Sequence, residues 1–333
     1  SLVGSEMCIR DRIVYVIVSS LSDIYFEQAW ASIWSLRFYN PQCMIDIVVD
    51  EQTIKVAKNS YRAKMLPLVD NIVMRKFSEE INNRERSRSL KTNLRHIVSG
   101  DYLFIDTDTI ITGDLSFVDN IVSPMAMVDD MNCNFIDNPN YARLSDRLKS
   151  LFGVKVLPSS HYYNSGVIYA KDNQDVHDFY RGWFKNWSLS KDKGCFLDQP
   201  ALYKTCMDYP NIVDVMSGEF NCQPSISIKF LSDAKIVHFF NDKNAESDLS
   251  PFLTGEIYKQ IKKEEELSDE IKRCLLNCKS SFSSPSKIIP GEDVLVWSSN
   301  SFIFLKTMSR KYPKIFHVME VLSFKLSSWI LKG

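Results

Sequence analysis

The sequence predicts an α/β fold with a mostly parallel central sheet flanked by helices, and two features of its 333 residues support this. Continuous apolar runs at 13–18 and 45–50 have the composition of buried parallel strands, and residues at helical spacing lie between them. A strand, a helix and a strand at this spacing form a βαβ unit. Strand and helix patterns then alternate to about residue 245, so we expect one α/β domain over residues 13–245.

The elements of this domain follow in chain order. The first strand, IVYVIV, is followed by SSLSD, where Ser22 or Asp23 is placed to cap a helix that ends at Asn40 and Pro41. After the second strand, IDIVVD, a basic segment leads to a third strand, YLFID. Further strands are expected at MAMV, GVIYA and AKIVHFF, and further helices around residues 141–151, 176–187 and 199–207.

The two ends of the chain differ from this domain in composition. Residues 1–12, SLVGSEMCIRDR, begin without Met, show no clear period and resemble translated sequencing-adapter sequence, so we treat them as a non-native segment. Residues 246–333 contain a highly charged helical stretch at 256–277, a Ser/Pro linker and a basic, aromatic tail. We expect a C-terminal helical extension over this range.

Composition excludes several classes of protein. The formal net charge is −1, so no overall positive field points to nucleic acid. Eight cysteines are scattered without a CxxC pair, which predicts free thiols in a reducing compartment and therefore a cytoplasmic protein. No run of 18 apolar residues occurs, which argues against a membrane-spanning helix.

The most informative stretch is YLFIDTDTIITGDL, in which Asp106 and Asp108 follow an apolar strand. Open α/β sheets place ligand-binding residues at the carboxyl ends of their strands. Two carboxylates two residues apart repel each other unless a cation neutralises them, and oxygen ligands suit Mg²⁺ or Mn²⁺. Such a cation would bind a diphosphate leaving group. The structural alternative is a pair of solvated turn aspartates.

This D-x-D segment resembles the central motif of retaining glycosyltransferases with a GT-A fold, in particular glycosyltransferase family 8. That family includes bacterial lipopolysaccharide galactosyltransferases and glycogenin. The resemblance extends over residues 13–243 and rests on several motifs in the same order. It implies a GT-A nucleotide-diphospho-sugar transferase fold, a UDP-sugar donor, a carbohydrate or glycolipid acceptor and a divalent metal.

The resemblance also implies donor-binding residues on both sides of the D-x-D segment. Tyr25, after the first strand, is expected to stack on the uracil base. Lys91 lies where the family has a basic residue that contacts the donor, with rivals at Arg86, Arg88 and Arg95. The acidic residue that accepts hydrogen bonds from the donor sugar corresponds to Asp129 or Asp130.

Two later motifs match the family in the same way. In HYYNSGVIYA, Asn164 is expected to hydrogen-bond a sugar or phosphate, and Gly166 to let the backbone approach the ligand. In FLDQPALY, Asp198 and Gln199 correspond to the Asp-Gln pair beside the reacting carbon, although Asp198 also suits a simple helix cap. EFNCQ, with Asn221, resembles the segment that follows.

The segment AKIVHFFNDKN supplies the last matching positions. His238 corresponds to the family's third metal ligand, which completes an Asp, Asp, His set. The family continues with a Gly and then Lys-Pro-Trp, whereas this chain has Asn241 and an early Lys243. This departure puts the diphosphate-binding role of Lys243 in doubt.

The tail combines basic residues with an apolar stripe at helical spacing, formed by Ile315, Met319, Leu322, Leu326 and Trp329. A basic amphipathic helix can lie on an anionic membrane surface, which predicts peripheral contact with the inner face of the cytoplasmic membrane. The alternative is a terminal helix docked on the catalytic domain.

Two rival functions remain at this point. A nucleotide-sugar-binding protein without turnover is compatible with the altered segment after His238. A haloacid-dehalogenase-like phosphatase also has D-x-D after a strand, but it requires Thr where this chain has Ile110.

Overall fold

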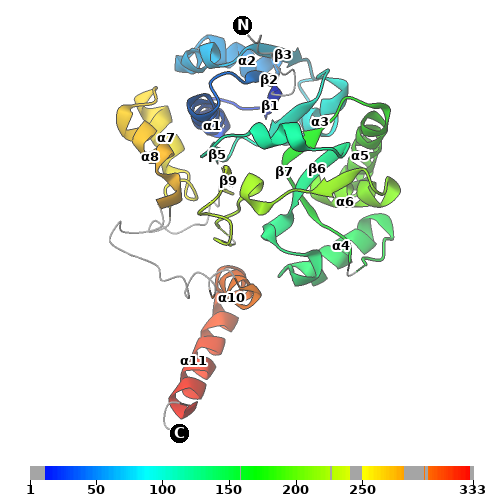
Figure 1. The fold of residues 1–333 in the computed structure, drawn as a ribbon, viewed down its shortest axis with the longest axis vertical. Coiled ribbons are helices and arrows are strands. Elements are labelled where there is room, and N and C mark those ends of the chain that lie inside the picture. Colours follow the sequence, from blue (N-terminus) through cyan, green and yellow to red (C-terminus); the bar gives the residue numbers. More distant parts are fainter. Residues whose placement is uncertain are drawn as a thin grey trace, which may run out of the picture.

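The computed structural model describes residues 12–157, 159–225, 227–240, 250–280, 296 and 299–330. Its central sheet has seven strands in the order β3-β2-β1-β4-β7-β6-β8 (Figure 1). Within this sheet β7 alone runs against the other strands, which confirms the predicted mostly parallel arrangement. The strands are β1 (Arg12–Ile17), β2 (Met44–Asp50), β3 (Asn71–Arg75), β4 (Tyr102–Ile105), β6 (Met125–Asp129), β7 (Tyr163–Ala170) and β8 (Val213–Val215).

A second, two-stranded sheet joins β5 (Thr109–Ile111) to β9 (Ile236–His238). The α-helices of the main body are α1 (Tyr25–Tyr39), α2 (Glu51–Lys58), α3 (Asn83–Thr92), α4 (Tyr141–Phe152), α5 (Gln174–Asp192), α6 (Gln199–Asp208), α7 (Glu256–Glu264) and α8 (Asp269–Leu276). Two further helices, α10 (Asn300–Lys311) and α11 (Pro313–Ile330), form the C-terminal extension.

Alternation along the buried strands separates two hydrophobic layers. Ile13, Tyr15 and Ile17 of β1 pack with α1, α7 and α8, whereas Val14 and Val16 face the side covered by α3 and α5. Because successive side chains of a strand point to opposite faces, a continuous apolar run is what a sheet covered on both sides requires. The apolar strands of the sequence are therefore the middle layer of a three-layer α/β domain.

Some local predictions differ from the structure. The charged stretch at 256–277 forms two helices and not one, because Glu265 has a positive φ of 58° and Ser268 caps α8 through Ile271 N–H. The N-cap of α1 is Ile24, whose side chain makes no capping hydrogen bond. Asp23, one of the two predicted caps, lies one residue earlier and accepts a hydrogen bond from the Tyr25 N–H. The short strands β3, β5 and β8 were not predicted.

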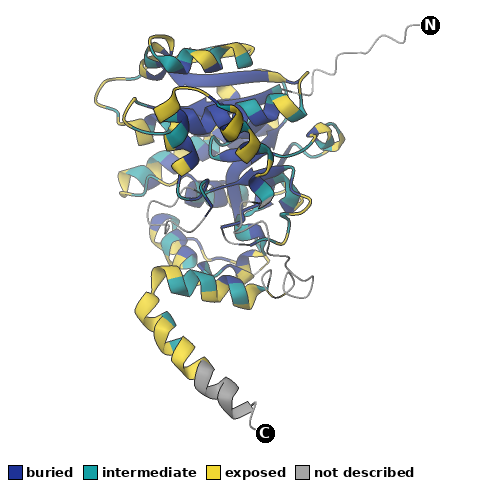
Figure 2. Cartoon of the chain, turned by 90° about the vertical axis from the view of Figure 1, so that its left-hand side faces the viewer, coloured by how far each residue is buried: buried dark blue, intermediate teal, exposed yellow. Residues whose placement is uncertain are grey.

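The core extends past residue 245. Side chains of 252–278, including Phe252 and Tyr258, are buried in the same cluster as β1 and α1, so α7 and α8 belong to the main body. α10 touches the body through buried Ile303, and α11 extends away from it (Figures 1 and 2). No disulfide joins any of the seven cysteines that the structure describes.

A buried ion pair fixes the loop between β1 and α1. Arg62 and Glu27 both have fully buried side chains, and two guanidinium–carboxylate contacts of 2.7 and 2.9 Å join them. The same guanidinium donates to Ser19 Oγ and to the Ser20 and Asp23 carbonyls. Arg62 thereby ties the 19–23 loop to the core immediately before Tyr25.

Replacing Arg62 with Met should lower the free energy of unfolding by about 3–5 kcal/mol, because Glu27 then remains buried without its counter-charge. Chemical denaturation measures this change. The matched control is Lys259→Met, which breaks an exposed pair with Glu256 and should have little effect. Equal losses in the two variants would contradict the role given to the buried pair.

Candidate functional site

The small β5–β9 sheet brings the D-x-D segment to His238. β5 begins directly after Asp108 and pairs with β9, so that Thr109 lies opposite His238, and the Phe239 N–H donates to the Asp108 carbonyl at 2.9 Å. Asp106, Asp108 and His238 each offer one ligand atom, and these atoms all lie within 4.8 Å of one another. Across the part of the chain that the structure describes, no other group of this kind occurs.

The geometry of this cluster fits a divalent cation. Asp108 Oδ1 and His238 Nε2 are 3.0 Å apart, and neighbouring ligands in an octahedral shell with bonds of about 2.1 Å are separated by about 3.0 Å. His238 Nδ1 lies 2.9 Å from Asn221 Oδ1, which places the proton on Nδ1 and leaves Nε2 free to act as a ligand. Two carboxylates and an imidazole suit Mn²⁺ or Mg²⁺.

Gly166 makes room for this imidazole. A Cβ at position 166 would lie 2.6 Å from His238 Nδ1 and 2.8 Å from Asn164 Oδ1. The Gly166 carbonyl also accepts from the Asp106 N–H at 2.7 Å. The expected role of Gly166, close approach of backbone to ligand, stays a prediction; among the described residues, the side chains that come close to it are those of His238 and Asn164.

Lys91 and Arg88 form ion pairs with carboxylates of the site. Lys91 Nζ lies 3.0 Å from Asp106 Oδ2 and 3.4 Å from Asp198 Oδ2, and its side chain is buried. Arg88 Nε is 3.2 Å from Asp198 Oδ1. Of the basic residues considered from the sequence, the site therefore contains Lys91 and Arg88. Arg86 instead pairs with Asp50, and Arg95 with Asp172, away from the D-x-D segment.

Charge compensation differs among the three carboxylates. Burial disfavours the charged form of Asp198, but Arg88 and Lys91 outweigh it and hold its pKa below the usual value. Burial raises the pKa of Asp106 despite the neighbouring Lys91. Burial also disfavours ionised Asp108, but His238 dominates and lowers its pKa. Asp106 is thus the carboxylate that gains most from an additional cation.

A second network joins the residues predicted to hold the sugar. Asp130 Oδ1 accepts from Asn164 Nδ2 and from Gln199 Nε2, each at 3.0 Å. Asn164 Oδ1 in turn accepts from Asn221 Nδ2 at 3.0 Å, which links this network to His238. Ser165 Oγ donates to Asp198 Oδ2 at 2.8 Å. The Asn-Ser-Gly and Asp-Gln motifs therefore meet at one place, opposite the D-x-D segment.

Asp129 and Asp130, two neighbouring acidic residues at the end of β6, have different side-chain partners. Asp130 points into the network described above, whereas Asp129 pairs with His161 at 3.0 Å. The turn after Asp130 is strained, with positive φ at Met131 and Asn132. Gln223 accepts from the Met131 N–H and braces this turn. Of the alternatives Asp129 and Asp130, only Asp130 lies beside Asn164 and Gln199.

The remaining predicted donor-binding residues are Tyr25 and Lys243. Tyr25 begins α1 with a half-exposed ring, close enough to Arg88 to contribute to the raised pKa of that guanidinium, whose main cause is Asp198. Lys243 lies outside the described residues.

Arg62, Ser165 and Gln223 support the site without having been singled out from the sequence. The role of Arg62 is visible only from its burial, and the roles of Ser165 and Gln223 are visible only from their tertiary contacts. Ser165 did stand inside the Asn-Ser-Gly motif, which was the one available signal.

Comparisons with known proteins bear on the fold. No protein-family model and no curated protein sequence matches the chain. Among solved structures, the galactosyltransferase LgtC in complex with donor and acceptor sugar analogues aligns with a TM-score of 0.50 and 13% identity, over 84% of this chain and 98% of LgtC. An active-site mutant of LgtC gives a TM-score of 0.49 with 12% identity over the same shares of the two chains.

Mouse xyloside xylosyltransferase 1, in its apo form, gives a TM-score of 0.46 with 12% identity over 68% of this chain and 96% of its own. The similarity to LgtC establishes the fold: the chain has the GT-A architecture that its motifs predicted.

Gly166→Ala should weaken Mn²⁺ binding at least about tenfold, because the added methyl group displaces the His238 ring from its position beside Asp108. Calorimetric titration with Mn²⁺ measures the affinity, and a thermal denaturation curve verifies that the variant folds. Asp129→Asn is the control, since Asp129 is paired with His161, and it should keep wild-type affinity. Unchanged Mn²⁺ affinity in Gly166→Ala would show that the imidazole is not a ligand.

Proposed function

We propose that the protein is a metal-dependent, retaining glycosyltransferase that moves a hexose from a UDP-sugar to a carbohydrate or glycolipid acceptor. The observation that carries this proposal is the meeting of Asp106, Asp108 and His238 beside Lys91 and Arg88. Carboxylates that hold a cation, next to two cationic side chains, form a site for a diphosphate. The sugar-binding network lies next to it, so the donor would span both.

Each residue of the site has a task in this proposal. Asp106, Asp108 and His238 would hold Mn²⁺ or Mg²⁺, which supplies positive charge to the diphosphate oxygens. Lys91 and Arg88 add charge at the same place, which favours departure of UDP. Tyr25, at the start of α1 and just after the 19–23 loop that Arg62 holds in position, would stack on the base.

The sugar itself would bind to the second network. Asp130 offers acceptor oxygens to sugar hydroxyls, and Asn164 and Gln199 hold its carboxylate in position. Asp198 lies between Arg88 and Lys91 and next to Gln199, at the junction of the diphosphate and sugar sites. Its ionised state suits an oxocarbenium-like transition state, which develops positive charge on the sugar.

Asp106→Ala and Asp108→Ala should each reduce metal-dependent transfer at least about 100-fold, because both remove a ligand of the cation. A thermal-shift panel of nucleotide-sugars, with and without Mn²⁺, identifies the donor, and UDP release then measures turnover. Asp114→Ala is the matched control, since Asp114 is exposed, lies in the same segment and bonds only Ser116 among the described residues.

The alternatives give different outcomes in the same assays. Full activity in both site variants would refute the site. Binding of a nucleotide-sugar without any UDP release would identify a binding protein, and release of phosphate from simple phosphomonoesters would identify a phosphatase.

We also propose that α11 contacts the membrane that carries a glycolipid acceptor. Its apolar residues Ile315, Val318 and Leu322 are 54%, 57% and 60% exposed, and Lys314 lies beside them. No helix among the described residues combines the length and the apolar character needed to cross a bilayer. An exposed amphipathic helix of this kind lies along a membrane surface.

Wild-type protein should sediment with vesicles that contain phosphatidylglycerol and much less with pure phosphatidylcholine vesicles. The triple variant Ile315→Ser, Val318→Ser and Leu322→Ser should abolish this binding, because it removes the apolar face of α11. Val122→Ser removes a valine that is 87% exposed on the main body and serves as control. Equal sedimentation of the triple variant and the wild type would disprove a role for α11.

A further inference from the structure

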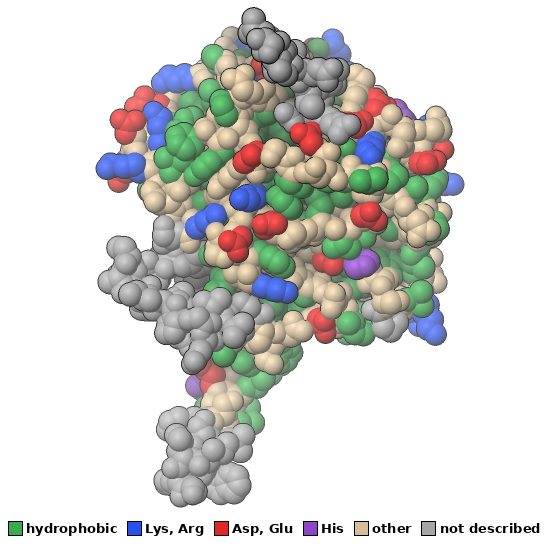
Figure 3. Space-filling view, viewed as in Figure 1, with side chains coloured by type: hydrophobic (Ala, Val, Ile, Leu, Met, Phe, Trp, Pro, Cys, Tyr) green, Lys and Arg blue, Asp and Glu red, His purple; other side chains and the backbone are tan. Residues whose placement is uncertain are grey.

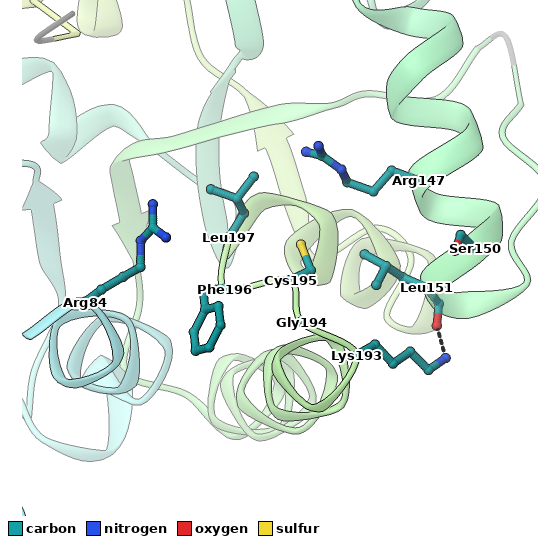
Figure 4. Close-up of a pocket in the computed structure, with 9 residues that line it drawn as sticks. All are labelled: Arg84, Arg147, Ser150, Leu151, Lys193, Gly194, Cys195, Phe196 and Leu197. Atoms are coloured by element: carbon teal, nitrogen blue, oxygen red, sulfur yellow. Dashed lines mark hydrogen bonds between the residues drawn. The ribbon is translucent and has the colours of Figure 1, made fainter. Parts of the chain in front are cut away.

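Figure 4 shows a cavity of about 530 Å³, whose lining includes Leu197, the residue before Asp198 of the proposed reaction site. Its walls come from α3, from the end of α4 and from the turn between α5 and α6. The size falls within the range of clefts that bind small ligands. The residues that line it are Arg84, Arg147, Ser150, Leu151, Lys193, Gly194, Cys195, Phe196 and Leu197.

The charged side chains in this lining all have the same sign. Arg84 and Arg147 form no ion pair with any described carboxylate, and Lys193 donates to the Leu151 carbonyl. Figure 4 shows Arg84 and Arg147 rising on opposite sides of the 195–197 segment. On the face of the body seen in Figure 3, by contrast, basic and acidic side chains are interspersed. Like charges gathered in a hollow attract an anion.

The cavity adjoins the reaction site along one helix face. Arg84 precedes Arg88 by four residues on α3, so their Cα atoms are about 6 Å apart along the helix axis and their side chains leave the same face. Arg88 already contacts Asp198, and Leu197 in the cavity wall is the residue before Asp198. A group bound at Arg84 is therefore about one helical turn from Arg88, which contacts Asp198.

The C-terminal extension adds to the same positive region. Lys311 of α10 donates to Asn140 Oδ1 at 2.5 Å, just before α4. Burial, followed by the nearby charges of Arg143, Arg310 and Arg147, lowers the pKa of Lys311. Lys311 thus adds a further cation near Arg147, which lines the cavity.

We propose that the acceptor is an anionic saccharide, whose phosphate or carboxylate group binds between Arg84 and Arg147. The inference rests on the proposed function, and it names the acceptor class for that site. The guanidinium groups provide planar pairs of donors that match the oxygens of either anion. Arg84 is exposed and Arg147 partly exposed, so both guanidinium groups are accessible to such an anion.

The test is calorimetric titration of the full chain with glucose, glucose 6-phosphate, glucuronate and inorganic phosphate, in saturating UDP and Mn²⁺. We expect at least one of the two anionic sugars to bind about tenfold or more tightly than glucose. The better of the two identifies phosphate or carboxylate as the recognised group. UDP affinity, measured in the same buffer, tests the proposed function separately from the acceptor.

The double variant Arg84→Gln and Arg147→Gln should lose this preference for an anionic sugar. Arg84→Lys with Arg147→Lys keeps both charges and should restore part of it. Lys149→Gln removes an exposed cation of α4 that does not line the cavity, and it should bind like the wild type. The proposal is overturned if glucose binds as tightly as both anionic sugars, or if the preference survives in the double glutamine variant.

Discussion

The site depends on one electrostatic balance, in which carboxylates that would repel one another are held together by buried cations. Asp106 and Asp198 come from distant parts of the chain, and both contact Lys91. An isolated ammonium group buried to this extent would be costly, and the two carboxylates offset that cost. Burial nevertheless raises the pKa of Asp106 despite its contact with Lys91, so a further positive charge there would stabilise its ionised form.

The reversed strand explains how the other half of the site reaches this place. β7 runs against β4 and β6, so its first residues lie where the parallel strands end. Asn164 and Gly166 therefore stand beside Asp106 and Asp130, which follow β4 and β6. Had β7 run parallel to its neighbours, these residues would lie at the far edge of the sheet. One change of strand direction thus joins the cluster of Asp106, Asp108 and His238 to the network around Asp130.

Local patterns in the sequence predicted the buried strands and the place of the D-x-D pair, whereas the other site residues were expected from the resemblance to a known family. Buried strands need continuous apolar runs, and the D-x-D segment stands at the end of one. What depends on tertiary contact was not predictable in the same way. The choice between Asp129 and Asp130 rests on which carboxylate meets Asn164, and adjacent residues look alike in a sequence. The break at Glu265 was hidden in a charged stretch because the residue with positive φ is not glycine.

Helix α3 shows how one amphipathic pattern can be misread. Arg84, Arg88 and Lys91 recur at spacings of four and three, which in a surface helix describes a solvated basic stripe. Here exposure falls along the stripe, from exposed Arg84 to half-buried Arg88 and buried Lys91. A basic stripe that runs from solvent into the protein has anionic partners at its inner end, and the structure places Asp106 and Asp198 there. Its outer end has no such partner among the described residues, and there Arg84 lines the cavity that we propose to bind an anionic group.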